Sequence, residues 1–240
     1  MRGAIMAGAA VGAALLAGCN HRDESPGRQI RRDIQVGAFE KVAVAGSYDV
    51  VVTVGGAPSA RVEGDSKRID RMDISVEGGT LRIREKRHRG FSFFSHDRNA
   101  VTVYVTTPAL VGADIAGSGD IRIDKVNGGD FHGAIAGSGD LQIGALQARS
   151  ASFAIAGSGN IQAAGKAESV DYSIAGSGDI AAGGLEARRA KVSVAGSGNV
   201  EGRAMESADI SIMGSGDVSL TGTAKCNIRK KGSGEARCGG

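Results

Sequence analysis

Apolar residues alternate with polar ones on both sides of a short glycine motif that returns along the second half of the chain. The motif is Gly-Ser-Gly followed by Asp, Asn or Glu, and its copies begin 18 to 20 residues apart. The copies begin at Gly117, Gly137, Gly157, Gly176, Gly196, Gly214 and Gly232. In the first copy the flanking apolar positions are Ile115, Ile121 and Ile123, and the other copies keep this spacing. A period of two predicts a strand with one buried face on each side of a glycine corner.

The fixed repeat near 20 residues is typical of a solenoid. Only stacked parallel coils keep the same positions inside, with each strand pairing about 4.8 Å from its equivalent in the next coil. The pattern therefore predicts an all-β parallel β-helix of single-stranded coils, right-handed because parallel crossovers are usually so. The glycines make the corner through positive φ or close approach, and we expect positive φ at Gly119, Gly139 and Gly159.

Residues 33–108 are rich in strand patterns but lack the tidy repeat. Residues 42–50 resemble a degenerate copy of the motif, with Tyr48 in place of the second glycine. Residues 60–63, 72–77, 80–85 and 100–106 also read as strands, and Gly78-Gly79 predicts a hairpin turn between two of them. No segment has a helical period. We interpret residues 33–240 as one domain.

The N-terminus has the pattern of a bacterial lipoprotein. A positive start precedes the apolar residues 4–17, which are too few to span a bilayer. Leu16-Ala17-Gly18-Cys19 resembles a lipobox, which implies a signal peptide over residues 1–18 and lipid on Cys19. Residues 19–32 are polar and predict a flexible tether. The alternative is an ordinary signal peptide with an incidental cysteine.

Composition and charge limit the classes of function. The 39 glycines, the 4% aromatic content and the absence of Trp suit a narrow β-solenoid. The formal net charge of +3 is too small to indicate a nucleic-acid partner. No motif indicates a cofactor.

The strand motifs resemble a known family. Phe39, the segments 42–50, 81–83 and 101–110, and the serial Gly-Ser-Gly-Asp copies are together similar to the head GIN domain family, which carries the label of auto-transporter adhesin. The resemblance covers about residues 33–234. It implies a β-helical protein of the bacterial cell envelope, often a lipoprotein, and brings no established activity. With Asn20 after Cys19, the lipoprotein sorting rule implies the outer membrane, with the domain facing the periplasm or the cell surface.

The acidic row of the repeat is the first candidate site. Its members are Asp120, Asp140, Asn160, Asp179, Asn199, Asp217 and Glu235. Carboxylates could bind calcium, which prefers several oxygen ligands, and the candidates are Asp120, Asp140, Asp179 and Asp217. The alternative is structural, because Asp and Asn favour corners by bonding nearby backbone N–H groups. The serines of the motif have no histidine at a repeat position, so a nucleophilic triad has no support.

Residues 82–98 form the second candidate, a cationic loop with aromatic residues. Its members are Arg82, Arg84, Lys86, Arg87, Arg89, Phe91, Phe93, Phe94 and Arg98. Such a loop could bind an acidic glycan, lipopolysaccharide, the membrane surface or another envelope protein. The alternatives are an unengaged hairpin loop, or phenylalanines that fold back over one end of the solenoid. His88 and His96 lack a third metal ligand.

Cys226 and Cys238 form the third candidate. They lie six residues before and after Gly232, both at inward positions of the repeat, and an oxidising envelope compartment favours a disulfide. The alternative is two buried free thiols.

We therefore predict a lipid-anchored, non-enzymatic envelope protein with a binding or scaffolding role. One alternative is a structural or stress-linked lipoprotein without a dedicated ligand. An enzyme acting on acidic polysaccharide is a further alternative, but it needs a cluster of unlike catalytic residues, and the sequence offers uniform rows.

Overall fold

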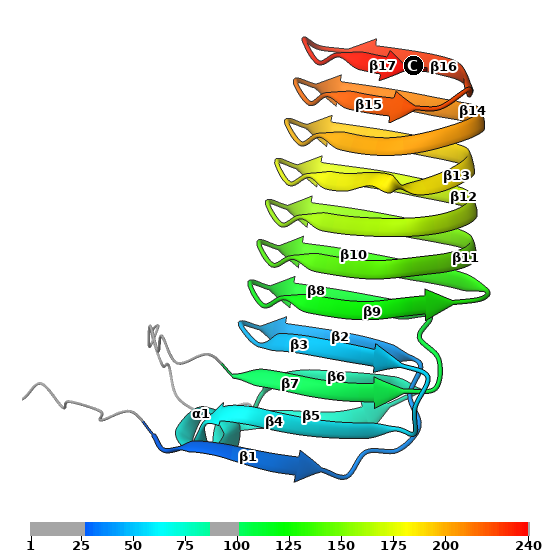
Figure 1. Cartoon of the computed structure of the whole chain (residues 1–240). Helices are drawn as coiled ribbons and strands as arrows, with labels where there is room; N and C mark the ends of the chain where they lie inside the picture. The colour runs from blue at the N-terminus through cyan, green and yellow to red at the C-terminus, as the bar shows by residue number, and fades with distance from the viewer. Residues whose placement is uncertain (1–26, 87–100, 240) are drawn as a thin grey trace, which may run out of the picture.

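Strands stack in two walls that meet at the glycine corners (Figure 1). The computed structural model describes residues 27–86 and 101–239. The first wall contains the strands that precede a corner: β2 (Lys41–Gly46), β8 (Gly112–Gly117), β10 (Asp130–Gly137) and β16 (Lys225–Lys231). The second wall contains the strands that follow one: β3 (Asp49–Val54), β9 (Ile121–Asn127), β15 (Val218–Thr221) and β17 (Ala236–Cys238). β7 (Thr102–Thr107) joins this wall by pairing in parallel with β3.

Four long strands run from the second wall round to the first wall of the next coil. They are β11 (Leu141–Gly157), β12 (Ile161–Gly176), β13 (Ile180–Gly196) and β14 (Val200–Gly214). Each pairs in parallel with the next, and repeat positions match, as Ile155 with Ile174 and Gly157 with Gly176. The predicted parallel β-solenoid is confirmed, with about six turns.

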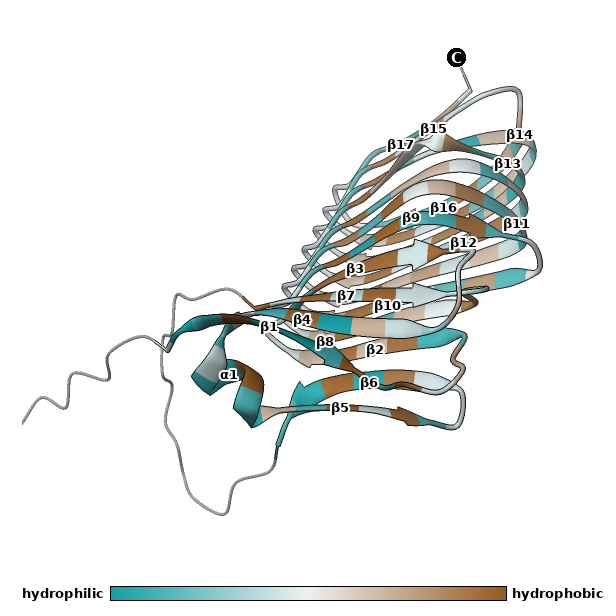
Figure 2. Ribbon diagram, turned by 60° about the horizontal axis from the view of Figure 1, so that its bottom comes forward, coloured by the Kyte–Doolittle hydropathy of each residue, from teal (hydrophilic) through white to brown (hydrophobic). Residues whose placement is uncertain are grey.

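The core is a set of apolar rows along the axis of the rod. The residues two positions before the first glycine of each corner, from Ile115 to Ile212, are at most 2% exposed. The residues four positions after that glycine, from Ile121 to Val218, are at most 1% exposed. Phe131, Phe153 and Tyr172 stack in successive coils with ring centroids 6.2 and 6.0 Å apart. Hydrophobic and polar bands alternate along the strands in Figure 2, as the period of two requires.

The two glycines of each corner serve different purposes. Positive φ is found at the first glycine, for example 140° at Gly137 and 138° at Gly157, so the prediction of positive φ at Gly119, Gly139 and Gly159 is wrong. At Gly159 a Cβ would overlap the carbonyl oxygen of Gly139 and lie 2.9 Å from Cγ2 of Ile135. The second glycine is therefore required by the close approach of the coils, because a side chain there would push them apart.

The N-terminal end is closed by strands that depart from the parallel stack. β1 (Gln29–Ile34) pairs antiparallel with β4 (Ser59–Asp65), and β4 pairs antiparallel with β7. β5 (Met72–Glu77) and β6 (Thr80–Glu85) form the hairpin predicted at Gly78-Gly79, and β6 pairs with β2. The sheet begins at Gln29, so the last residues of the expected tether, 29–32, belong to the folded part.

One short helix, α1 (Ser66–Arg71), lies at this end and was not predicted (Figure 1). The buried carboxylate of Asp65 begins it by accepting hydrogen bonds from the N–H groups of Lys67 and Arg68. The Arg68 guanidinium lies over the ring of Tyr48, 5.6 Å from its centroid. Tyr48 takes the position that the second glycine has in the later coils, so the row of second glycines ends there, and α1 covers Tyr48. None of the helices in the described ranges is long and apolar enough to cross a bilayer.

Candidate functional site

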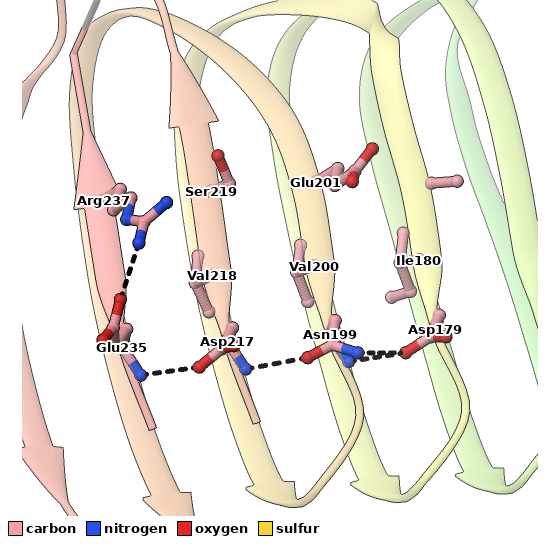
Figure 3. Close-up of a pocket in the computed structure, with 11 residues that line it drawn as sticks. Asp179, Ile180, Asn199, Val200, Glu201, Asp217, Val218, Ser219, Glu235 and Arg237 are labelled. Carbon is pink, nitrogen blue, oxygen red and sulfur yellow. Dashed lines mark hydrogen bonds and ion pairs between the residues drawn. The ribbon is translucent and has the colours of Figure 1, made fainter. Parts of the chain in front are cut away.

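The acidic row runs along the second wall as a continuous series of hydrogen bonds (Figure 3). Each side-chain oxygen accepts the backbone N–H of its equivalent in the next coil, at distances of 2.8 to 3.2 Å from Asp120 to Glu235. The series starts one coil earlier, because the Asp120 N–H donates to Asp49 of the degenerate copy at 3.3 Å. The side chains thus accept hydrogen bonds from backbone N–H groups, as the structural alternative expects, but each N–H group belongs to the following coil rather than to the residue's own corner.

Asparagines at two places in the row relieve repulsion between carboxylates. The amide nitrogen of Asn160 donates to Asp140 and that of Asn199 donates to Asp179, both at 3.0 Å. A row of aspartates alone would bring like charges to adjacent strands, which is destabilising. From Asp140 to Asn199 the alternation of Asp and Asn therefore separates the carboxylates, whereas Asp120 beside Asp140 and Asp217 beside Glu235 remain neighbouring acids. Among residues 27–86 and 101–239, no group of three or more His, Cys, Asp or Glu side chains could hold a metal ion.

Beside the C-terminal end of this row lies a shallow hollow of about 440 Å³ (Figure 3). Its polar lining includes Asp179, Asp217, Glu201 and Arg237. The Arg237 guanidinium binds Glu235 at 2.9 Å, and the row carboxylates are engaged by backbone N–H groups. The hollow can accept hydrogen bonds from a polar ligand.

The first wall carries a second hollow, of about 540 Å³, that the sequence reasoning missed. It is lined mainly by small residues from successive coils: Ala43, Ala45, Ala116, Ala134, Ala136, Ala154, Ala156 and Ala175. These alanines occupy outward positions next to Val44 and the buried isoleucines. One row, from Ala45 to Ala175, is unbroken from β2 to β12, and the parallel row that starts at Ala43 includes Asp114 and Ser173. We call this surface the alanine face. In the sequence it was obscured because alanine is common on both faces of a strand.

The structure describes only the start of the predicted cationic loop. Arg82 and Arg84 lie on β6, where Arg82 pairs with Glu77 at 3.1 Å and Arg84 pairs with Asp73 at 2.9 Å. These acids raise the pKa of Arg84, because its guanidinium donates a hydrogen bond to Asp73 and lies near the charge of Glu77. Lys86 donates to the backbone oxygen of Asp70 at 2.8 Å. Arg82, Arg84 and Lys86 therefore stabilise the N-terminal end of the rod.

The other predicted loop residues lie outside the described ranges. They are Arg87, Arg89, Phe91, Phe93, Phe94 and Arg98, together with His88 and His96. Cys19, the predicted lipidation site, also lies outside.

The predicted disulfide between Cys226 and Cys238 is confirmed. Cys226 stands beside the buried Ala208 and Cys238 beside the buried Leu220, so both occupy inward positions of the last coil, one on each wall. The bond joins the two walls where no further coil follows in the described chain.

The fold and its surface rows define a solenoid in which each coil presents the same few positions to solvent. The chain belongs to the head GIN domain family, because the family model described as "Putative auto-transporter adhesin, head GIN domain" matches residues 38–224. The resemblance found in the sequence is thereby confirmed. The family description is adhesin-like and supports a non-enzymatic protein of the cell surface or envelope.

Solved structures share the fold. A putative adhesin from Bacteroides fragilis is 23% identical, with a TM-score of 0.78, and the match covers 88% of this chain and 97% of that one. A structure from Parabacteroides distasonis named "Putative lipid binding protein" is 28% identical, with a TM-score of 0.71 and the same coverage. A putative adhesin from the same organism is 22% identical, with a TM-score of 0.70, and again covers 88% and 97%. No curated protein matches the chain.

Proposed function

We propose that this chain is a lipid-anchored binding module of the bacterial cell envelope, used for adhesion and without catalytic activity. The observation that carries the proposal is the uniformity of the described coils. Their repeated acidic side chains accept hydrogen bonds from backbone N–H groups of the next coil, as Asp179 accepts one from Asn199. Catalysis needs unlike groups held around one reacting atom, whereas a repeated surface suits an extended contact. Membership of an adhesin-like family supports the same role.

The anchor is tested by Cys19→Ser. The substitution removes the thiol that would carry lipid, so the variant should lose metabolic labelling by a palmitate analogue and leave the membrane fraction. Cys226→Ser is the matched control, because it replaces a cysteine elsewhere in the chain and should leave the labelling unchanged. Unchanged membrane association of Cys19→Ser would contradict the anchor.

Adhesion through the predicted loop is tested by replacing residues 87–97 with Asn-Gly. Lys86 is kept because its N–H donates to Arg71 O at 2.7 Å and its Nζ binds Asp70 O. Aromatic and Arg side chains concentrate binding energy, so the shortened chain should bind immobilised lipopolysaccharide or acidic polysaccharide less. Its melting temperature should stay close to that of the wild type. A folded variant that binds as before would place the contact elsewhere, and an unfolded one would show that the phenylalanines belong to the core.

The alanine face supports a second candidate function, contact with lipid. Contiguous exposed apolar surface marks interaction sites more often than scattered apolar residues do, and one structural neighbour is named a putative lipid binding protein. The double variant Ala136→Glu/Ala156→Glu should abolish co-sedimentation with lipid vesicles. Gln142→Glu/Gln162→Glu adds the same charge on the second wall and should not. Equal loss in both variants would indicate a general charge effect.

A further inference from the structure

The C-terminal end of the rod is an open and strongly basic strand edge. Residues 225–239 contain five basic residues, Lys225, Arg229, Lys230, Lys231 and Arg237, and one acidic residue, while the whole chain carries a formal net charge of only +3. Among the described residues, β16 pairs with β14 alone, so its outer edge has no partner strand. That edge presents free backbone N–H and C=O groups at the tip of the rod (Figure 1).

The basic side chains alternate along this edge. Lys225, Arg229 and Lys231 are opposite Ser207, Ser211 and Met213 of β14, which are outward positions of the wall. All three are exposed, and no ion pair links them to an acidic group of residues 27–86 or 101–239. Two arginines of inner coils do meet an acid one coil away, Arg149 with Asp130 at 2.8 Å and Arg188 with Glu206 at 2.6 Å. The tip therefore lacks the acidic strand that would complete this arrangement.

The inward positions of β16 discourage pairing with a second copy. Lys230 takes the place of the buried Ile212, and its Nζ donates to Gly234 O at 3.2 Å. A charge at an inward position of an edge strand prevents another apolar coil from stacking on it. Two tips placed edge to edge would also bring their lysines and arginines together, and like charges on adjacent strands are destabilising.

We propose that the edge of β16 binds an extended acidic segment of another protein by strand addition. Backbone groups of the segment would pair with the free edge, and carboxylates at every second position would meet Lys225, Arg229 and Lys231. Between them, an apolar residue would cover Ile228, which is 42% exposed. The inference specifies a partner for the proposed binding role and does not depend on the lipid anchor. β1, the first strand of the described chain, lies at the other end of the rod (Figure 1).

The test uses the purified full-length chain and a fluorescent heptapeptide of alternating Glu and Val. Binding is followed by anisotropy at low salt. The variant Lys225→Ser/Arg229→Ser/Lys231→Ser should bind about tenfold more weakly or worse, because it lacks the basic side chains that would meet the carboxylates of the peptide. Lys125→Ser/Lys166→Ser/Lys191→Ser removes the same charge from other coils and should bind like the wild type. Equal binding by both variants would overturn the proposal.

Strand addition has a signature that simple charge attraction lacks. Alternate residues of a strand direct their backbone groups to opposite edges. Two peptides are therefore compared, one methylated on the amide nitrogens of the odd-numbered residues and the other on those of the even-numbered residues. One of the two should lose binding and the other keep it. If both methylated peptides bind like the parent, the contact is electrostatic only and the proposal is wrong. Tighter binding of anionic vesicles or acidic polysaccharide than of the peptide, lost in the same triple variant, would also overturn it. None of these outcomes decides the adhesion assay of the loop variant, so the two proposals fail separately.

Discussion

Replacing the second glycine of a central corner should separate two coils. At Gly159 the backbone is in an ordinary region, so Gly159→Ala adds a methyl group without φ strain. That methyl would overlap the Gly139 oxygen and lie 2.9 Å from Cγ2 of Ile135, both held by the preceding coil. Neither neighbour is the end of a flexible side chain that can move away.

The loss of stability in Gly159→Ala can be worked out from the contacts that the added methyl group disturbs. Parting the coils at this corner weakens the bonds from the N–H groups of Ser158 and Gly159 to Gly137 O, which measure 2.9 and 3.1 Å. Each is worth about 1 kcal/mol net, and overpacking adds about 1–3 kcal/mol. We therefore expect Gly159→Ala to lower the free energy of unfolding by about 3–5 kcal/mol. Gly159→Val, which is larger, should cost more.

Urea unfolding followed by far-ultraviolet circular dichroism measures this difference. Gly183→Ala is the matched control, because a Cβ at Gly183 meets nothing within 4 Å. It should be neutral or stabilising by up to about 1 kcal/mol, since alanine reduces the freedom of the unfolded chain. If Gly159→Ala and Gly183→Ala unfold at the same urea concentration, the close approach of the coils at the corner is not what requires glycine.

Three further predictions concern the core, the row and the tip. The Tyr172 hydroxyl is buried without a hydrogen-bond partner, so Tyr172→Phe should stabilise the protein by about 1–2 kcal/mol in the same urea assay. Burial raises the Tyr172 pKa above its usual value near 10, so the folded state keeps this proton to higher pH than the unfolded state does. The stability of the wild type should therefore fall more steeply above about pH 10 than that of Tyr172→Phe. Parallel pH profiles of the two proteins would contradict this. Asp179→Ala removes the acceptor of two hydrogen bonds from Asn199 and should cost about 1–2 kcal/mol, whereas Glu201→Ala on the same wall should stay within about 0.5 kcal/mol. Cys226→Ser/Cys238→Ser opens a link spanning 12 residues and should cost about 3 kcal/mol, and an unchanged urea midpoint would show that the bond does not stabilise the last coil.

The repeated part of the fold could be predicted from the sequence because one short motif carries most of its geometry. Alternating apolar positions around Gly117 and its equivalents give the strands, and the constant spacing gives the parallel stack. The same reasoning placed Cys226 and Cys238 at inward positions. These features depend on local pattern and on register between equivalent residues.

Features that depend on neighbours in space were harder to foresee. The first glycine of a corner needs positive φ because of the path that the backbone takes there. The second must lack a Cβ because the neighbouring coil lies too close. α1 spans only six residues, too short for a helical period to show, and it is identified by the capping carboxylate of Asp65. Arg82 and Arg84 looked like ligand-binding residues because their ion-pair partners, Glu77 and Asp73, lie on the other strand of the hairpin.

The matched register between coils also bears on how such a protein can change its length over evolution. The corner at Gly157 pairs with the corner at Gly176, and the strand that joins them keeps matched positions with the next coil apart from a register shift between Gln162 and Ala164. A duplication or deletion of one genetic unit of this size would rejoin equivalent positions, leaving the hydrogen-bond series and the core rows continuous. The length of the rod could therefore be adjusted in single-coil steps without redesigning either of its ends.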